Sequence, residues 1–390
     1  MEKRQLLILC TLLLLAVSPA MKAQSAASAQ TATAAETATA AEILANMQLA
    51  NDYFMNKWPD VGKTIITNRE RPSNIWTRAV YYEGLMALYE IDPDKRYYNY
   101  AVDWGTFHNW GFRSGNLTRN ADDQCAGQTY IDLYNIDPQP ERIANITECI
   151  DHVVAGDQND DWSWIDAIQM GMPIFAKLGV LYEDDKYFDK MYDMYMFTRN
   201  EHGDNGLYNP KDKLWWRDGD FDPPYTEPNG EDCYWSRGNG WVIMALARVM
   251  DIIPEDTKGY KQYLKDFKAM SKALAKVQRE DGTWNVSLHD PNHYGGMEFS
   301  GTAMFAYGMA WGINNGVLSE KKYLPVVEKA CKALTEDCMH DNGFLGYVQS
   351  TGKEPKDGQP VTYDKQPDFE DYALGAFLLA GKEMYLLKNK

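Results

Sequence analysis

The sequence has no basic patch and, after its first residues, no apolar segment long enough to span a membrane. Lysine and arginine number 39 against 56 aspartates and glutamates, which gives a formal net charge of −17 at pH 7. Nucleic-acid binding needs clustered basic residues that neutralise phosphates, so this balance argues against it. A transmembrane helix needs about 20 apolar residues. We therefore expect no nucleic-acid partner and no membrane span.

Cysteine is scarce and follows no metal-binding or disulfide pattern. Beyond the N-terminal segment the cysteines are Cys125, Cys149, Cys233, Cys331 and Cys338. Their number is odd, no CxxC pair occurs, and none lies near a histidine cluster, so the sequence indicates neither a zinc site nor a disulfide framework. We interpret most of them as small buried apolar residues, and we expect no metal ion and no organic cofactor.

The first 23 residues have the pattern of a secretory signal peptide. Lys3 and Arg4 precede an apolar stretch over 6–17, and small residues over 18–23 suit cleavage near Ala20 or Ala23. Residues 24–40 are rich in Ala, Thr and Ser, which predicts a flexible leader. Residues 41–390 contain no comparable linker and are expected to form one domain. We expect an exported protein, periplasmic or secreted, whose oligomeric state the sequence does not define.

What the chain does have is a high aromatic content, with 12 Trp and 25 Tyr, and a loose internal repeat. Six segments begin with polar or small residues and continue as apolar stretches rich in Gly and Ala, at intervals of roughly 45 to 70 residues. They start at Trp76, Ala121, Trp164, Trp235, Phe299 and Phe369. Between them lie charged segments with apolar residues at three- and four-residue steps, which is typical of half-exposed helices.

This alternation predicts an all-α fold of six inner and six outer helices, an (α/α)6 barrel. The alternative is an open α-solenoid, but such arrays have a tighter repeat length. Each outer helix returns the chain, so the inner helices run in one direction and their N-termini meet at one end. Amide groups at helix N-termini favour anions, and a concave pocket at that end is the expected active site.

Asp166 is the first candidate for chemistry at that end. It lies in "DDWSWIDAIQM", where Trp162 and Trp164 precede it and a run of apolar residues follows it. Apolar surroundings disfavour the ionised carboxylate and raise its pKa, so Asp166 can donate a proton near neutral pH and take it back later. The alternative is a structural role, in which Asp166 only caps the amides of its helix.

A second carboxylate is expected from "NADDQCAG", which contains Asp122 and Asp123. A carboxylate opposite Asp166 would raise the pKa of Asp166 further or hold a water molecule. One of the two aspartates is expected to cap the helix that begins here. A Mg²⁺ or Ca²⁺ pair is the alternative, but such sites carry more oxygen ligands in a recognisable loop.

The string "CYWSRGNGW" is the most specific in the chain. Its glycines allow a ligand to approach the backbone, the Arg237 guanidinium suits a carboxylate, and tryptophan rings stack on sugars. A structural salt bridge of Arg237 is the alternative. Across all strings, the residues predicted to bind substrate are Asp122, Trp164, Arg217, Trp235, Arg237, Asn239, Trp241, His293, Ser300 and Thr302.

Three of these predictions have their own alternatives. Ser300 and Thr302 begin an apolar segment, where we expect their hydroxyls to face the pocket; no Ser/His/Asp grouping supports Ser300 as a nucleophile. His293, in "DPNHYGG", is predicted to lie on a loop over the pocket, and a surface loop without a role is the alternative. Arg217, in "LWWRDGDFD", is expected with Trp215 and Trp216 at the rim, where further sugars would bind, and a hydrophobic staple beneath a loop is the alternative.

Taken in order, "WSWIDAIQMGMPIFAKLG", "YWSRGNGWVIMALARVM", "FSGTAMFAYGMAWGINNG" and "DYALGAFLLAGKEMY" resemble the unsaturated rhamnogalacturonyl hydrolases of glycoside hydrolase family 105. The related unsaturated glucuronyl hydrolases of family 88 share the fold. The resemblance runs from about residue 41 to residue 387 and implies an (α/α)6 barrel without a cofactor. One departure is "GLYNPKDKLWWRDG", in which Arg217 stands where many family members have a histidine, so the neighbouring sugar stays open.

The resemblance also implies an unusual reaction. The substrate is an oligosaccharide with a 4,5-unsaturated uronic acid at its non-reducing end, as polysaccharide lyases leave it. By resemblance, Asp166 protonates C4 and activates a water molecule toward C5, after which the hemiketal opens and the neighbouring sugar departs. The second acid is expected to be Asp123, with Asp122 as the second choice.

Two other functions remain open on the sequence. A conventional (α/α)6 glycosidase would use two carboxylates on a saturated glycoside. A periplasmic sugar-binding protein would use the same aromatic and polar residues without turnover. The sequence does not distinguish glucuronate from galacturonate in the substrate.

Overall fold

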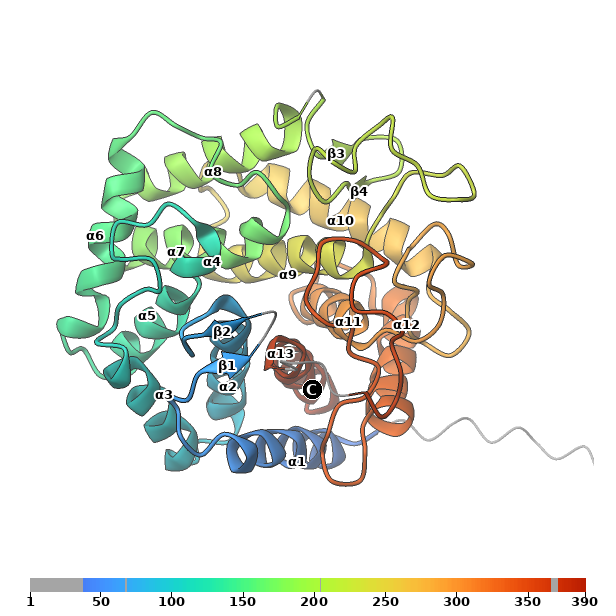
Figure 1. Cartoon of the computed structure of the whole chain (residues 1–390), viewed down its shortest axis with the longest axis horizontal. Helices are drawn as coiled ribbons and strands as arrows, with labels where there is room; N and C mark the ends of the chain where they lie inside the picture. The colour runs from blue at the N-terminus through green and yellow to red at the C-terminus, as the bar shows by residue number, and fades with distance from the viewer. Residues whose placement is uncertain (1–37, 67–68, 204, 366–370) are drawn as a thin grey trace, which may run out of the picture. The chain divides into compact units, whose positions relative to one another are not determined.

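Outer and inner helices alternate along the chain in the computed structural model, which describes residues 38–66, 69–203, 205–365 and 371–390 (Figure 1). The outer helices are α1 (Ala40–Lys57), α3 (Lys95–Phe107), α6 (Glu141–Ala155), α8 (Asp185–Asn200), α10 (Tyr260–Lys276) and α12 (Glu320–Lys332), which continues into the π-helical turn η2 (Ala333–Cys338). The inner helices are α2 (Trp76–Ile91), α5 (Ala126–Ile136) with the short α4 (Ala121–Gln124) before it, α7 (Asp166–Tyr182), α9 (Ser236–Ile252), α11 (Phe299–Asn314) and α13 (Asp371–Lys388).

The inner helices form a closed ring. Each packs against the next one in chain order, from α2 to α5, α7, α9, α11 and α13, and α13 packs back against α2. Each outer helix packs on the inner helix beside it, such as α8 on α7 or α10 on α9. The predicted (α/α)6 barrel is confirmed, and all six predicted apolar segments correspond to inner helices. The described order begins with the outer helix α1 and ends with the inner helix α13.

Local sequence explains which helices are inside. The inner helix α11 is buried from Phe299 to Ile313, because its residues are apolar or small on every face. The outer helix α10 buries one stripe that includes Tyr263, Phe267 and Met270, while lysines occupy its exposed positions. Outer helices also carry side-chain caps, such as Asp94 on α3.

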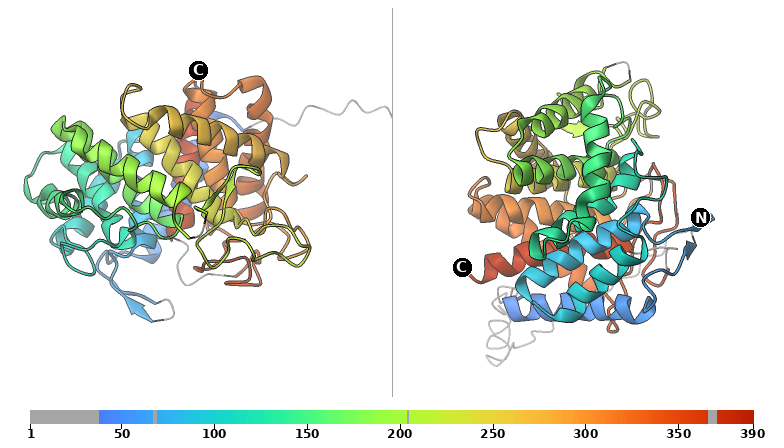
Figure 2. Two further views of the ribbon diagram at one scale, coloured as in Figure 1. Left: turned by 90° about the horizontal axis from the view of Figure 1, so that it is seen from above. Right: turned by 90° about the vertical axis from the view of Figure 1, so that its left-hand side faces the viewer.

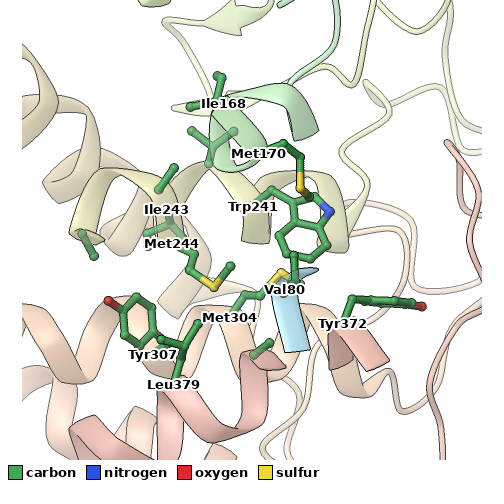
Figure 3. Close-up of a cluster of buried hydrophobic side chains, with 14 of the residues drawn as sticks. Val80, Ile168, Met170, Trp241, Ile243, Met244, Met304, Tyr307, Tyr372 and Leu379 are labelled. Carbon is green, nitrogen blue, oxygen red and sulfur yellow. The ribbon is translucent and has the colours of Figure 1, made fainter. Parts of the chain in front are cut away.

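The centre of the ring is filled by large apolar side chains rather than by an open channel. Figure 3 shows residues from α2, α7, α9, α11 and α13 in contact there. They are all buried, and the labelled ones are Val80, Ile168, Met170, Trp241, Ile243, Met244, Met304, Tyr307, Tyr372 and Leu379. The site for a ligand must therefore lie at an end of the barrel.

Glycines bring α2 and α13 together where the ring closes. A Cβ added to Gly84 would lie 2.6 Å from the Cα of Gly375, and one added to Gly375 would lie 2.1 Å from the carbonyl oxygen of Val80. No side chain fits at either position, so the two backbones pack directly on each other. A buried ion pair between Arg78 Nε and Asp371 Oδ2, 2.5 Å apart with both side chains inaccessible, lies near this contact.

The N-termini of the inner helices share one end, as predicted. The rings of Trp76, Trp241 and Tyr372, from the first two turns of α2, α9 and α13, lie within 5.5–6.2 Å of one another. The hairpin of β1 (Ile65–Ile66) and β2 (Glu70–Arg71) lies on the side opposite to the C-terminal end of α13 (Figure 2). A second hairpin, β3 (Tyr208–Asn209) with β4 (Leu214–Trp215), precedes α9.

Other expectations have mixed outcomes. The signal peptide and most of the leader fall on residues 1–37, outside the described part, and α1 begins at the leader's last residue, Ala40, with a capping box formed by Thr39 and Glu42. All five described cysteines are free and buried, as interpreted. Among the described helices, none is both long and apolar enough to cross a bilayer.

Candidate active site

Asp166 is the first residue of α7, and a β-bridge fixes the chain beside it. Trp164 pairs with Asp218 in an antiparallel bridge, and the amide of Ile165 donates to the carbonyl oxygen of Arg217 at 3.0 Å. This pairing brings the guanidinium of Arg217 to Asp166, with Nη2 3.3 Å from Oδ2. Arg217 also forms an ion pair with Asp218.

The carboxyl group of Asp166 is almost enclosed. The residue is 9% exposed, and its Oδ1 is buried without a hydrogen-bond partner among the described residues. A Cβ added to Gly238 would lie 3.6 Å from this oxygen, so the first turn of α9 covers it. Burial raises the pKa of Asp166 against the opposing charges of Arg217 and Arg237. Oδ1 is therefore the oxygen that can hold a proton.

The apolar surroundings of Asp166 differ from the expected ones. Trp162 is buried, but it packs on Phe175 with ring centroids 5.8 Å apart, and an added Cβ on Gly171 would touch its indole nitrogen. Trp162 thus packs on α7 about one and a half to two and a half turns beyond Asp166. Trp164 remains partly exposed next to Asp166.

From the surroundings of the two aspartates we infer that Asp122 is the second acid, although the sequence analysis places Asp123 first. Asp123 is buried, its Oδ1 pairs with Arg113 Nη2 at 2.7 Å, and its Oδ2 accepts from Thr118 Oγ1 at 3.3 Å. Asn120 caps α4 by accepting from the amide of Asp122 at 2.9 Å, so neither aspartate is needed as the cap. Asp122 is left to face the site.

The carboxyl groups of Asp122 and Asp166 interact with each other. Burial, and then the negative charge of Asp166, raise the pKa of Asp122 to about 7, while Arg113 acts in the opposite direction. Two carboxylates in one enclosed site do not both ionise easily, so the pair retains one proton close to neutral pH. This arrangement can donate a proton and accept one in the same reaction.

Asp122→Asn is expected to stabilise the fold at pH 8 and to change its stability little at pH 4. The pKa of Asp122 lies at about 7 in the folded protein against an ordinary 3.8, so the folded state loses stability as pH rises through this window. An asparagine carries no charge, and its gain at pH 8 is at most about 4 kcal/mol. Thermal unfolding of both proteins at pH 4 and pH 8 measures the difference.

The neighbouring Asp123 supplies the control for this measurement. Asp123→Asn removes the partner of Arg113 and is expected to destabilise the protein at pH 8. If Asp122→Asn also lowers the melting temperature at pH 8, the ionised carboxylate of Asp122 does not destabilise the folded protein.

Arg237 and Trp235 hold a loop of the protein in this structure. Arg237 Nη1 donates to the carbonyl of Gln349 at 2.7 Å, its Nη2 donates to the carbonyl of Ser350 at 2.9 Å, and the residue is 1% exposed. The indole of Trp235 donates to the side chain of Gln349 at 2.9 Å. The predicted sugar contacts are therefore replaced by contacts to residues 349–350, although the charge of Arg237 still reaches Asp166.

Asn239 and Trp241 make contacts within the protein in this structure, and their predicted contacts to substrate stay predictions. The Asn239 side chain accepts from the amide of Trp215 at 2.9 Å and donates to its carbonyl at 3.0 Å, which fixes β4 on α9. Trp241 is 1% exposed and belongs to the core between Trp76 and Tyr372. Its ring meets that of Trp76, which is partly exposed, edge-on at a centroid distance of 5.9 Å.

The hydroxyls of Ser300 and Thr302 face the protein instead of the pocket. Ser300 Oγ donates to Glu298 Oε1 at 2.6 Å, and Thr302 Oγ1 donates to the carbonyl of Glu298 at 2.6 Å. Both residues are fully buried, and Glu298 caps α11 through the amides of Ser300 and Gly301. The polar start of this helix is a capping structure.

His293 lies on a loop and is held by a buried carboxylate. Its Nδ1 contacts Glu227, which also accepts from Ser287 Oγ at 2.9 Å, and the His293 side chain keeps 23% exposure. A contact between His293 and substrate stays a prediction, as it does for Trp164 and Arg217. Of the predicted site residues, Asp122, Asp123, Asp166, Arg217 and Arg237 are brought into electrostatic contact in the described part of the chain.

Sequence reasoning missed two charged residues around the acids. Arg113 follows a helix end in a loop, and no pattern links it to Asp123. Glu83 lies in the middle of α2 with no exposed side-chain surface. A single acid within the apolar string "AVYYEGLMALY" was the available signal for Glu83.

Comparison with known proteins agrees with this architecture. An unsaturated 3S-rhamnoglycuronyl hydrolase from Formosa agariphila is 32% identical over 334 residues, which cover 80% of this chain and 85% of that protein. The structure of a family 88 glycosyl hydrolase from Bacteroides vulgatus is 30% identical with a TM-score of 0.80, over 89% of this chain and 99% of that one. A family 105 glycoside hydrolase from C. acetobutylicum, 21% identical with a TM-score of 0.68 over 86% and 98% of the two chains, shares the fold.

The family follows from the extent of the match along the chain. The model of Glycosyl Hydrolase Family 88 matches residues 46–388, from α1 to the last residue of α13. This range includes every inner helix and both candidate acids, so the ring and the site are matched together. The resemblance stated from the sequence is confirmed, and the chain belongs to glycosyl hydrolase family 88.

Proposed function

We propose that this glycoside hydrolase removes a 4,5-unsaturated uronic acid from the non-reducing end of an oligosaccharide by hydrating its C4=C5 double bond. The observation that carries the proposal is the enclosed pair of Asp166 and Asp122, whose pKa values are both raised. Protonating a carbon of an enol ether needs an acid that still holds its proton near neutral pH, and burial of the pair provides one.

The residues of the site account for each step of that hydration. The carboxyl group of Asp166 gives its proton to C4, while the contact between Arg217 and Oδ2 fixes the plane of the carboxyl group. Positive charge develops at C5 and the ring oxygen, and a water molecule attacks C5. The ionised Asp166, with Asp122 beside it, accepts the proton that the water loses. The resulting hemiketal opens and releases the neighbouring sugar.

The substrate class follows from the relatives. The Formosa agariphila protein and a protein from Alteromonas sp., which is 29% identical over 89% of this chain, are both named unsaturated 3S-rhamnoglycuronyl hydrolases. We infer that an unsaturated uronic acid linked to a rhamnose unit is the first substrate to test. Arg217 and the His293 loop are the described residues that we assign to the choice of the neighbouring sugar.

A panel of unsaturated disaccharides from polysaccharide lyases is expected to lose its alkene ultraviolet absorbance when the enzyme is added. Saturated disaccharides of the same sugars should react at least roughly 100-fold more slowly, because protonation of the double bond creates the charge that the site stabilises. The readouts are absorbance and released sugar on each substrate.

The two other functions give different results in that assay. A conventional glycosidase releases sugar and leaves the alkene absorbance unchanged. A binding protein shows saturable binding of the same disaccharides without any product. Either result would contradict the hydration proposal.

A further inference from the structure

Glu83 is a buried carboxylate within the barrel core that the proposed reaction does not use. It lies on the third turn of α2, is 2% exposed, and has tyrosine, glycine and leucine as its neighbours in the chain. A carboxylate in such a place is retained only when it is paired and hydrogen-bonded. The groups that bind the carboxylate of Glu83 therefore indicate its role in the structure.

Three side chains from three other inner segments bind the two oxygens of Glu83. Gln169 Nε2 donates to Oε2 at 2.9 Å, and Arg248 Nη1 lies 3.4 Å from the same oxygen. Cys125 Sγ donates to Oε1 at 3.3 Å. Glu83 thus connects α2 with α7, with α9, and with the junction of α4 and α5.

Two of these partners are spaced three residues from the candidate acids. Gln169 follows Asp166 by three positions on α7, and Cys125 follows Asp122 by three positions where α4 runs into α5. Cys125 has helical backbone angles, so the spacing is that of one helical turn in both cases. Residues three apart share a helix face. Glu83 therefore binds the turn beneath each acid.

A second layer of hydrogen bonds holds the same turns together. Gln128 Nε2 donates to the carbonyl oxygens of Gln169 and Met170 at 2.8 and 3.2 Å, and its Oε1 accepts from Arg248 Nη2 at 2.9 Å. Arg248 bridges Glu83 and Gln128. All these side chains are buried, so solvent does not compete for the bonds.

We propose that Glu83 is a positioning residue, which sets the placement of Asp122 relative to Asp166 by joining Cys125 and Gln169 through its carboxylate. The inference rests on the proposed function of the two acids. Movement of α7 against the α4–α5 junction by a fraction of a turn would separate the acids, and the Glu83 bonds oppose that movement. Glu83 does not touch the reacting atoms and acts only through these helices.

Glu83→Gln tests the inference by steady-state kinetics on an unsaturated disaccharide that the wild-type enzyme hydrates. The amide keeps the size of the side chain but cannot accept from Gln169, Cys125 and Arg248 together. We expect kcat to fall by about 10- to 100-fold with KM within about threefold, since small misplacements of catalytic groups lower rates by such factors. A residue with only a structural role would change the melting temperature and leave kcat unchanged in the folded fraction.

Glu383→Gln is the matched control. Glu383 is another buried glutamate on an inner helix, α13. It accepts from Asn314 at 2.7 Å and lies in the C-terminal half of α13, whereas both acids lie at the N-terminal ends of inner helices. This variant is expected to keep wild-type kcat. Equal kcat losses in both variants would overturn the inference, because any buried glutamate would then have the same effect.

If Glu83→Gln does not fold, Gln169→Met tests the same positioning role. It removes one bond to Glu83 and leaves the backbone carbonyl that Gln128 binds, so kcat should fall about 3- to 10-fold at unchanged KM. Wild-type kcat in folded Glu83→Gln, or in Gln169→Met, overturns the positioning role. A wild-type enzyme that leaves the alkene intact instead contradicts the proposed function, so the two failures are distinguishable.

Discussion

Asp166→Asn is expected to lower kcat on an unsaturated disaccharide by about 10²- to 10⁴-fold, the range that loss of a general acid and base produces. Asparagine retains the shape of the side chain and can still contact Arg217, but it cannot supply a proton to C4. Binding of the disaccharide is expected to remain within about threefold of wild type, because the ground state does not use that proton. Absorbance kinetics and calorimetric titration measure the two effects.

Asp185→Asn is the matched control, since Asp185 is the first residue of α8 as Asp166 is of α7. Asp185 is exposed on an outer helix, and its variant is expected to retain kcat within twofold. Residual activity of Asp166→Asn above about a tenth of wild type would assign the proton donor to another residue, first to Asp122.

Arg78→Met is expected to lower the free energy of unfolding by about 3 to 5 kcal/mol, the largest stability effect that we predict for one substitution. The substitution leaves Asp371 buried without its cation, at the contact between α2 and α13 that closes the ring. Arg78 also lies over the rings of Trp58 and Phe54, and methionine replaces part of that packing. Urea unfolding at neutral pH measures the change.

Arg96→Met provides the comparison, because Arg96 pairs with Asp94 at 2.8 Å with more than half of its side chain exposed. An exposed pair contributes at most about 1 kcal/mol. A second substitution, Asp371→Leu, should recover part of the loss in Arg78→Met by removing the unpaired charge. A loss for Arg78→Met no larger than for Arg96→Met would show that the buried pair does not hold the ring closed.

The architecture could be predicted from the sequence because the residues of each segment alone indicate whether its helix is buried. The string from Phe299 to Ile313 has no charged residue, so it cannot lie at a surface, and the outer string from Tyr260 shows a single apolar stripe. Six such alternations leave few arrangements other than a ring. Each decision was local, and none required knowledge of a distant residue.

The choice between Asp122 and Asp123 could not be made in this way. The two side chains leave α4 in directions about 100° apart, and both are equally acidic in the sequence. The decision depends on Arg113 and Thr118, which reach Asp123 from the preceding loop and bind both of its oxygens. A single sequence does not show that approach.

The sequence did not show the structural contacts of the polar residues at the inner helix starts, for a related reason. A hydroxyl or amide at a helix start can bind a ligand or satisfy the backbone, and the residue type is the same in both cases. Ser300 and Thr302 hydrogen-bond to Glu298, Asn239 hydrogen-bonds to β4, and Arg237 hydrogen-bonds to the loop at residues 349–350. The partners lie tens of residues away for the last two, so only the folded chain distinguishes the roles.

Closure of the ring depends on α13, which packs on both α2 and α11. Until Asp371 and Gly375 have been synthesised, Arg78 has no counterion and α2 has no neighbour on one flank. A ribosome-bound or proteolytically clipped chain that ends before α13 has an incomplete ring, although it already contains Asp122 and Asp166. We therefore expect a chain that stops before α13 to lack activity, because its ring cannot close.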